Sequence, residues 1–566
     1  RWLVAVTLIL LPPMAAARLA QPYLLKIAID NHIVKGEMEG LPLLVGWFIL
    51  LILAESLFTY AQVWLLQYVG QKVMFDLRME LFSHVQRMPT AFFDRTPTGS
   101  LVTRLTSDVE VLGEMFAAGI ITIVGDIMVL AGIIGIMLWM NLKLSLVTFS
   151  VLPLLVWVAF TFRRRMREAF RQVRARLANL NAFLAESIGG MAVVQLFNRQ
   201  AREQEEFTRL NAAYRDANLP VISWDAALYA LVETLSSVAV GIIVWYGGGE
   251  ILRGALTFGA LVAFIQYIEK FFSPIRDLSA KYSIMQGAMA ALERIFNLLD
   301  REQVEPLSPS PQPPPLTGAG KGDRPVERIE FRDVWFAYDG EEFVLKGFNL
   351  RLSRGERVAL VGETGGGKTT VTRLLSRLYD AQRGMIFFDD TDIRELSLQE
   401  LRSRIGVVLQ DPYLFTGSIA FNISLGDEGA HRRVEEAART VGADRFIRQL
   451  PNGYGEEVRE RGVNLSAGER QLISFARAVA FDPEILVLDE ATASIDTASE
   501  RLIQEGLRGL MAGRTSLVVA HRLSTIQDAD RIVVIHRGEK MEEGNHQELL
   551  AKRGLYYRLY QLQFKD

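Results

Sequence analysis

The sequence predicts two structural classes in one chain: an all-α domain with six membrane-spanning helices, followed by an α/β domain of the P-loop type. Three observations lead to this prediction. Long apolar stretches run from the N-terminus to about residue 290. A proline-rich segment then interrupts the chain, and after it apolar strands alternate with helical patterns around a phosphate-binding motif.

Composition supports a membrane protein of several domains. The chain has 566 residues, of which 50% are hydrophobic, and its mean hydropathy is +0.17. The net charge of −3 offers no basic field, so we expect no nucleic-acid partner. The absence of cysteine excludes disulfides, zinc–thiolate sites and thiol catalysis.

Six apolar stretches are each long enough to cross about 30 Å of hydrocarbon as a helix, which takes about 20 residues. A large soluble helical protein is the alternative, but six such stretches in one half of a chain argue against it. The predicted spans are Trp2–Ala28, Leu41–Val69, Phe116–Met140, Leu144–Phe162, Val221–Ile251 and Ala255–Ile275.

The distribution of basic residues predicts the orientation of these spans. The segment Arg163–Asp216 carries 11 lysines and arginines, whereas the three connections on the other side carry only Lys35, Lys143 and Arg253. We therefore expect both chain ends, and the α/β domain with them, to lie in the cytoplasm.

Two of the basic segments are long enough to be helical extensions into the cytoplasm. Gln71–Glu114 and Arg163–Asn218 would continue about 25 Å or more beyond the membrane at 1.5 Å per residue. We expect each to turn around a short crosswise segment, near Ala91–Leu101 in the first and near Asn198–Leu210 in the second.

Seven prolines between residues 302 and 325 predict a semi-extended linker. The expected domain limits are therefore residues 1–301 for the membrane domain, 302–325 for the linker and 326–566 for the nucleotide-binding domain.

The motif G-x-x-x-x-G-K-[ST] occurs at Gly362–Thr369, between the strand-like Arg357–Val361 and the helical Thr370–Leu378. Its glycines let backbone N–H groups surround phosphates, and the helix N-terminus adds positive potential. We expect Lys368 to reach the β- and γ-phosphates of ATP and Thr369 to bind Mg²⁺.

A second buried-strand pattern, Ile485–Asp489, ends in two carboxylates. Asp489 is placed to hold the Mg²⁺ water shell, and Glu490 to polarise the attacking water as a general base. A strand capped by two solvated acids is the alternative.

Three more features accompany these motifs. Leu465–Glu469 precedes a helical run that starts at Arg470. This predicts a second helix N-terminus able to bind phosphate. His521 follows the apolar strand Ser516–Ala520, where it could sense a γ-phosphate, and Gln410 follows another apolar strand in the same way.

Together these motifs resemble the ATP-binding cassette (ABC) transporters, in order and along the whole chain. The resemblance implies an adenine-stacking Tyr338, a Q-loop Gln410, a signature at Leu465–Glu469, a D-loop at Ser494–Asp496 and a switch His521. It implies catalytic roles for Glu490, His521, Gln410 and Asp489, and Mg²⁺ contacts from Thr369, Gln410 and Asp489. ATP contacts would come from Tyr338, Gly362, Thr364, Gly365, Gly367, Lys368, Thr369, Thr370, Ser466 and Gly468.

The membrane half resembles the exporters of this family. The residues in question are Phe92-Phe93-Asp94, Thr98-Gly99, Arg104 and Asp108, then Glu186–Gly189, Val194 and Phe197. The resemblance implies a half-transporter in a bacterial inner membrane that pairs with a second half, so that ATP held by one cassette is closed over by the partner's signature. Alternating access would then export a hydrophobic or amphiphilic substrate through the bilayer.

The signature departs from the family's usual Leu-Ser-Gly-Gly-Gln, because Ala467 replaces a glycine and Glu469 replaces the glutamine. An added Cβ and a carboxylate should both weaken closure on a γ-phosphate. We therefore expect a heterodimer, in which this chain resembles a subunit that keeps its catalytic glutamate while its partner's site is degenerate. A homodimer that tolerates these changes is the alternative.

The substrate is left open by the sequence. Charges within or near the spans could line a cavity or pair between helices, and their mixed signs permit peptides, drugs or lipids. They are Arg18, Glu55, Asp126, Asp225, Glu233, Glu269 and Lys270. A homodimeric lipid flippase or multidrug exporter, an ATP-gated channel or regulator, and a soluble ABC ATPase are the competing functions.

Overall fold

The computed structural model describes residues 2–116, 120–301, 325–340, 342–489, 497–520 and 522–564. Its contacts divide the chain into two compact units, one with residues up to 87 and 96–301, the other with 88–95 and the chain from 325 onward. The predicted linker, the D-loop Ser494–Asp496, Glu490 and His521 lie outside the described residues.

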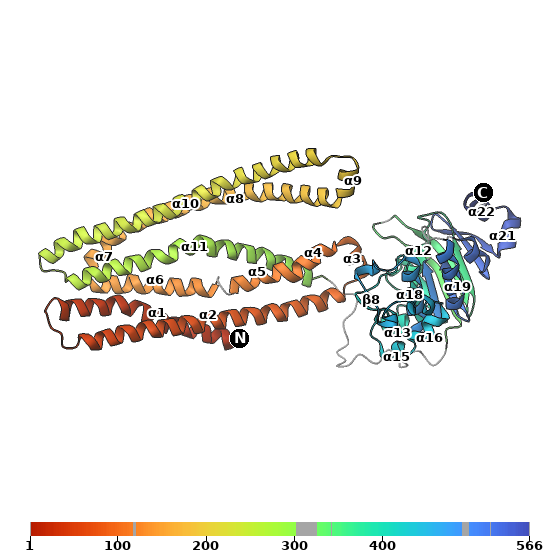
Figure 1. Ribbon diagram of the computed structural model, residues 1–566, viewed down its shortest axis with the longest axis horizontal. Helices are drawn as coiled ribbons and strands as arrows, with labels where there is room; N and C mark the ends of the chain where they lie inside the picture. Colours follow the sequence, from red (N-terminus) through yellow and green to blue (C-terminus); the bar gives the residue numbers. More distant parts are fainter. Residues whose placement is uncertain are drawn as a thin grey trace. The chain divides into compact units, whose positions relative to one another are not determined.

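The first unit is entirely helical (Figure 1). Its elements are α1 (Trp2–Ala28), η1 (Ile29–Ile33), α2 (Leu41–Gln86), α4 (Thr98–Thr103), η2 (Arg104–Asp108), α5 (Val109–Glu114), α6 (Ile120–Met140), α7 (Leu142–Phe149), α8 (Leu152–Gly189), α9 (Met191–Leu196), α10 (Gln200–Leu252) and α11 (Phe258–Leu299). Together with the second unit described below, this confirms the predicted fold class.

Five helical stretches in the described part of the chain are long and apolar enough to cross a membrane. They coincide with the first five predicted spans, except that the fourth contains a break between α7 and α8 at Ser150–Val151. The sixth predicted span lies in α11, which carries the charged pair Glu269 and Lys270 at mid-span and is not among the five.

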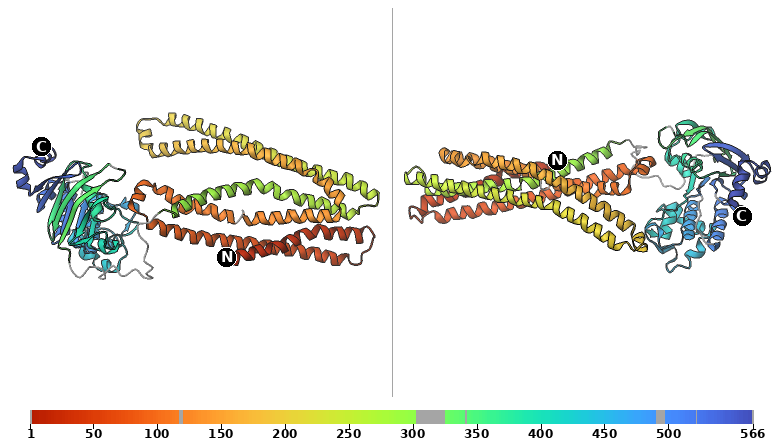
Figure 2. Two further views of the ribbon diagram at one scale, coloured as in Figure 1. Left: turned by 180° about the vertical axis from the view of Figure 1, so that it is seen from behind. Right: turned by 90° about the horizontal axis from the view of Figure 1, so that it is seen from above.

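The second crosswise segment lies earlier than the sequence predicts. The helix α8 ends at Gly189, the short α9 follows, and α10 already begins at Gln200. The expected range Asn198–Leu210 is therefore wrong for most of its length, because the glycine pair at 189–190 and the left-handed Asn198 (φ 51°) place the turn before α10. Beyond this turn α8 and α10 lie side by side (Figure 2).

Several of the intramembrane charges pair between helices. The guanidinium of Arg18 lies 3.9 Å from Glu55, and Lys270 donates to the carbonyl oxygen of Arg18 at 3.0 Å. Asp126 forms an ion pair with Lys281. The side chains of Asp225, Glu233 and Glu269, on α10 and α11, are exposed.

The second unit begins with α3 (Thr90–Arg95) and then forms an α/β domain with three sheets. Its strands are β1 (Arg328–Phe336), β2 (Leu345–Ser353), β3 (Arg357–Val361), β4 (Arg383–Phe388), β5 (Thr391–Asp392), β6 (Ile405–Val408), β7 (Gly417–Ser418), β8 (Glu457–Val458), β9 (Ile485–Asp489), β10 (Thr515–Val519), β11 (Arg531–His536) and β12 (Glu539–Gly544).

The helices of this unit cover the sheets. They are α12 (Lys368–Leu375), α13 (Leu398–Arg404), α14 (Ile419–Ser424), α15 (Glu428–Arg432), α16 (Val434–Thr440), α17 (Asp444–Ile447), η4 (Gly453–Gly455), η5 (Glu460–Gly462), α18 (Ala467–Ala480), α19 (Thr497–Met511), α20 (Leu523–Gln527), α21 (His546–Lys552) and α22 (Leu555–Phe564).

The largest sheet has the order β12-β11-β3-β10-β9-β6, and its strands from β11 to β6 are parallel. The register pairs Val519 with both Leu360 and Asp489, so β3, β10 and β9 end at one edge. Ligands of open α/β sheets bind at such carboxyl edges. This topology therefore brings the carboxyl ends of β3, β6, β9 and β10 to one edge of the sheet.

Candidate ATP-binding site

The loop between β3 and α12 has a backbone that requires glycine. Gly367 is the N-cap of α12 and has a left-handed φ of 102°, and Gly365 has φ 80°. A Cβ on Gly362 would lie 2.1 Å from the carbonyl oxygen of Ile535, and one on Gly367 would lie 2.9 Å from Leu345 Cδ2. The loop can therefore pass close to the sheet. Its Gly366 N–H donates to the Glu363 carbonyl oxygen at 3.1 Å, and the other glycine N–H groups of the loop are suited to surround an anion.

Lys368 opens α12 and is 5% exposed. Its ammonium donates to the carbonyl oxygens of Gly362 and Glu363, both at 2.8 Å. Burial lowers the pKa of Lys368, and the charges of Asp489 and Glu363 oppose that shift. The side chain is thus a buried cation held over the loop by two backbone carbonyls.

Thr369 and Asp489 come together at the carboxyl edge of the sheet. The hydroxyl of Thr369 donates to Asp489 Oδ1 at 3.3 Å, across 120 residues of sequence. A hydroxyl and a carboxylate are ligands that Mg²⁺ accepts while it keeps several waters. The described residues contain no cluster of three or more His, Asp or Glu side chains that could hold a metal. By the chemistry of its two oxygen donors, the Thr369–Asp489 pair fits Mg²⁺.

Gln410 follows β6 and is exposed. The described residues give its side chain no hydrogen bond to Thr369 or Asp489, so the structure places it at the same edge without joining it to the pair. Thr364 is likewise exposed within the loop.

Tyr338 and Thr370 contact each other, which the sequence did not reveal. Their hydroxyls lie 3.1 Å apart, and Arg373 donates to the Tyr338 hydroxyl at 3.4 Å. The tyrosine ring packs edge-on against Phe336 and Tyr379, with centroids 4.9 and 5.2 Å away. The aromatic side chain is therefore fixed beside the first turn of α12, where the loop glycines also converge.

The short helix α3 contacts this aromatic cluster. Arg95 donates to the carbonyl oxygen of Tyr338 at 2.9 Å, and the hydroxyl of Tyr379 donates to the carboxylate of Asp94. Burial, together with the Asp94 carboxylate, raises the pKa of Tyr379 to about 12, so this hydroxyl remains a donor at neutral pH. Asp94 belongs to the Phe92-Phe93-Asp94 motif, but only the fold shows which residue it meets.

The signature residues form the first turn of α18, which begins at Ala467 and not at Arg470 as the sequence predicts. Ser466 is the N-cap, and its Oγ accepts from the Glu469 N–H at 3.3 Å. In return the Glu469 carboxylate accepts from the Ser466 N–H at 2.7 Å. This capping box extends the helix by one turn. Ser466 and Ala467 are exposed, whereas Gly468 is buried.

Arg477 links α18 to the segment after Gln410, a connection without any signal in the sequence. Its Nε donates to the carbonyl oxygen of Asn422 at 2.8 Å and an Nη donates to that of Tyr413 at 3.1 Å. Burial lowers the pKa of Arg477. Arg477 therefore joins the segment that contains Tyr413 and Asn422 to the helix that carries Ser466.

Comparisons with known proteins agree with this geometry. The family model described as ABC transporter transmembrane region matches residues 6–275, and the one described as ABC transporter matches residues 345–493. A probable multidrug resistance ABC transporter ATP-binding/permease protein of Bacillus subtilis is 39% identical over 532 residues, which are 93% of this chain and 77% of that protein.

Two further relatives carry lipid-related names. An ATP-dependent lipid A-core flippase of Syntrophus aciditrophicus is 36% identical and covers 100% of this chain and 92% of its own length. A fatty acid ABC transporter ATP-binding/permease protein of Mycobacterium tuberculosis is 39% identical, covering 90% of this chain and 79% of its own.

Among solved structures, a bacterial Atm1-family ABC exporter with ATP bound matches with a TM-score of 0.80 and 29% identity, over 100% of this chain and 99% of that chain. The chain belongs to the ABC transporters, as an exporter half-transporter whose ATP hydrolysis is coupled to transport across a membrane.

Proposed function

We propose that this half-transporter works in a heterodimer that exports hydrophobic or amphiphilic substrates, with its altered signature facing the partner's nucleotide. The observation that carries the heterodimer is the capping box of α18, in which the Glu469 carboxylate accepts from the Ser466 N–H. An N–H at this helix start is a donor that a γ-phosphate would need. A glutamine could make the same bond, but Glu469 adds a negative charge beside this donor, which opposes an incoming phosphate.

The residues of this chain's own ATP site carry no such departure. The bound nucleotide supplies the phosphoanhydride bond and Mg²⁺ would offset its charge. The loop N–H groups at Gly365 and Gly367 would bind the phosphate oxygens of the nucleotide. The Lys368 ammonium would exchange its two carbonyl acceptors for phosphate oxygens. Thr369 and Asp489 would hold the metal. Gly362, Thr364, Thr370, Tyr338, Ser466 and Gly468 complete the proposed ATP contacts, and Gln410, Glu490 and His521 the catalytic ones.

The amphiphilic substrate class rests on the relatives. Three of them carry names that refer to multidrug resistance, to lipid A-core and to fatty acids, which share an apolar body. The half-transporter would lie in a bacterial inner membrane. Residues 1–301 would form its membrane domain, residues 302–325 the linker and residues 326–566 a cytoplasmic ATPase domain.

Purification tests the partnership. The chain expressed alone should give little hydrolytically competent dimer, because both of its sites would close over Ala467 and Glu469. Expressed with a half-transporter that carries Leu-Ser-Gly-Gly-Gln, it should form a one-to-one complex by native mass spectrometry and hydrolyse ATP at its own site. A fully active homodimer would contradict the heterodimer.

A further inference from the structure

Arg373 is a basic side chain of the nucleotide-binding unit that forms no ion pair among the described residues. It lies on α12, one helical turn after Thr370 and on the same face of that helix. The side chain is half-buried. A guanidinium that has lost part of its water and has no counter-ion needs other acceptors for its N–H groups.

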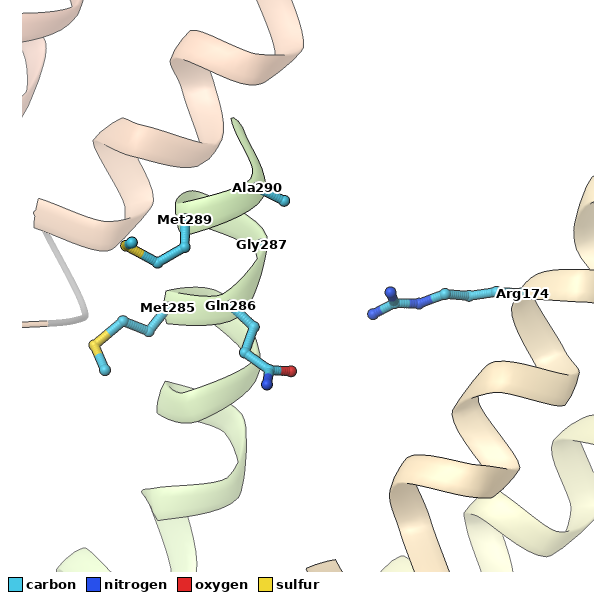
Figure 3. A pocket seen from close by; sticks show the side chains of 6 residues that line it. All are labelled: Arg174, Met285, Gln286, Gly287, Met289 and Ala290. Carbon is cyan, nitrogen blue, oxygen red and sulfur yellow. The ribbon is translucent and has the colours of Figure 1, made fainter. Parts of the chain in front are cut away.

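Another arginine without an ion pair in the described part of the chain shows the difference. Arg174 of α8 is exposed and borders a cavity of about 450 Å³, whose other side is lined by Met285, Gln286 and Met289 of α11 (Figure 3). Its guanidinium can therefore remain hydrated. Arg373 instead packs against a tyrosine, so the fold determines its contacts.

The acceptor for Arg373 is the hydroxyl of Tyr338. An Nη of the arginine donates to this oxygen at 3.4 Å, which is long for a hydrogen bond. The guanidinium carbon also lies 5.7 Å from the centroid of the tyrosine ring, within the range of a cation–π contact. The two contacts together hold the guanidinium against Tyr338.

The backbone around this tyrosine is itself fixed. Gln382 forms two hydrogen bonds with Ala337, the preceding residue: its amide oxygen accepts from the N–H at 2.7 Å, and its amide nitrogen donates to the carbonyl oxygen at 2.8 Å. The carbonyl oxygen of Tyr338 accepts from Arg95 at 2.9 Å. Because the chain is held on both sides of the side chain, the Tyr338 hydroxyl has a defined place beside α12.

These contacts give the next hydrogen bond a direction. A guanidinium can only donate, so the Tyr338 oxygen accepts from Arg373 and its own hydrogen is directed to Thr370 Oγ1, 3.1 Å away. The Thr370 oxygen then accepts, and its hydrogen is left for a further acceptor. Among the described residues no such acceptor bonds it, and Thr370 is only 4% exposed. A buried hydroxyl hydrogen without an acceptor is costly, so an incoming acceptor would gain from it.

The place of Thr370 indicates what that acceptor is. The residue lies in the first turn of α12, two residues after Lys368 and three after the N-cap Gly367. This helix start is suited to bind the phosphates of a nucleotide. The hydrogen-bond chain therefore runs from a cation outside the phosphate-binding loop to a hydroxyl beside it.

We propose that Arg373 is a positioning residue for nucleotide binding, which acts through the hydroxyls of Tyr338 and Thr370 and makes the Thr370 hydroxyl a donor to a phosphate oxygen. The inference rests on the proposed ATP site and deepens it, because it gives Tyr338 a polar role besides stacking on the base. An arginine that read the base itself would bond to ring acceptors, which differ between adenine and guanine.

Binding of three ligands to the whole chain in nanodiscs tests this role. AMP-PNP and GMP-PNP differ in the base, and tripolyphosphate has no base. Arg373→Met removes the donors and keeps the length of the side chain. The matched control is Arg383→Met, because Arg383 on β4 is exposed and lies 5.6 Å from the ring centroid of Phe343, away from the loop.

We expect Arg373→Met to raise the Kd of all three ligands ~3- to 10-fold, the range for loss of one hydrogen bond, and Arg383→Met to leave each Kd unchanged. Arg373→Lys should restore most of the affinity, because it returns a cationic donor. Tyr338→Phe keeps the ring and breaks the hydrogen-bond chain. Adding Arg373→Met to Tyr338→Phe should therefore weaken tripolyphosphate binding no further.

A change in the Kd of only one of the two nucleotides would mean that Arg373 reads the base, and would overturn the proposal. An unchanged Kd for tripolyphosphate would overturn it too, as would a full effect of Arg373→Met in the Tyr338→Phe background. Equal effects of Arg373→Met and Arg383→Met would show a general loss of charge or structure, which contradicts the proposal as well.

Lys368→Ala separates this inference from the proposed function. If Lys368→Ala left AMP-PNP binding unchanged, the ATP site itself would be wrong, and the role of Arg373 with it. If Lys368→Ala weakened binding and Arg373→Met did not, only the role of Arg373 would be wrong. The unfolding temperature without ligand checks the fold, and a drop shared by Arg373→Met and Arg373→Lys would assign the arginine to stability alone and overturn the proposal.

Discussion

The carboxylate of Glu469 accepts a hydrogen bond from the backbone N–H of Ser466 at 2.7 Å, at the exposed start of α18. A glutamine at position 469 could make the same bond through its amide oxygen, so the capping geometry does not require a charge. What the glutamate adds is a negative charge at a helix N-terminus, where the dipole would otherwise favour an incoming phosphate. The altered signature is therefore expected to act through this negative charge, by weakening the attraction of the helix N-terminus for phosphate.

Glu469→Gln tests the charge alone. In the chain purified by itself, we expect ATP hydrolysis to rise several-fold, up to ~10-fold, with a further rise when Ala467→Gly is added. The control is Glu548→Gln, which removes the same charge from a second capping box, at Asn545. If neither Glu469→Gln nor the added Ala467→Gly changed the ATPase rate, the signature changes would be neutral.

Glu490→Gln should leave ATP binding intact and lower turnover at least ~10²-fold, the range for loss of a general base. The substitution keeps the shape of the side chain and removes its basicity. Single-turnover hydrolysis alongside binding of a labelled ATP analogue separates the two steps. Turnover within threefold of the wild type would refute the assignment.

Lys368→Ala should weaken nucleotide binding itself, because the buried ammonium is the cation nearest the loop glycines. We expect the Kd for a labelled ATP analogue to rise at least ~10-fold, as for loss of one charge-assisted hydrogen bond. The exposed Lys346 provides the control, since Lys346→Ala removes an equal charge from β2. Equal affinities of the two variants would exclude the phosphate role of Lys368.

Tyr379→Phe removes the hydroxyl that bonds Asp94 and keeps the ring that packs on Tyr338. We expect basal ATP hydrolysis to change little and stimulation by substrate to fall, because α3 would lose one of its contacts beside the nucleotide. Asp94→Asn should have a similar effect, and the double variant should be no worse than either single one. Tyr557→Phe, at a half-buried tyrosine of α22 whose hydroxyl accepts from Gln561, is the control.

If Tyr379→Phe and Asp94→Asn lowered basal hydrolysis and transport equally, the contact would be structural and not a coupling element. The ratio of stimulated to basal ATPase activity in proteoliposomes distinguishes these outcomes.

The sequence by itself determined the fold class, the position of five spans and the family. These depend on local patterns: apolar length fixes a span, and the Gly362–Thr369 motif fixes a loop whose φ angles only glycines tolerate. It misplaced the turn near Asn198 and the start of α18. Helix ends depend on single caps such as Ser466, whose competing local conformations differ by about 1 kcal/mol.

Only the tertiary structure decided which distant residues meet. Thr369 and Asp489 are 120 residues apart and touch because β3 and β9 flank β10 in one parallel sheet. Arg18 and Lys270 could have lined a cavity or paired between helices, and packing brought both to interhelical partners. A periodic pattern tells which face of an element is apolar, but the partner of that face is set by the path of the whole chain.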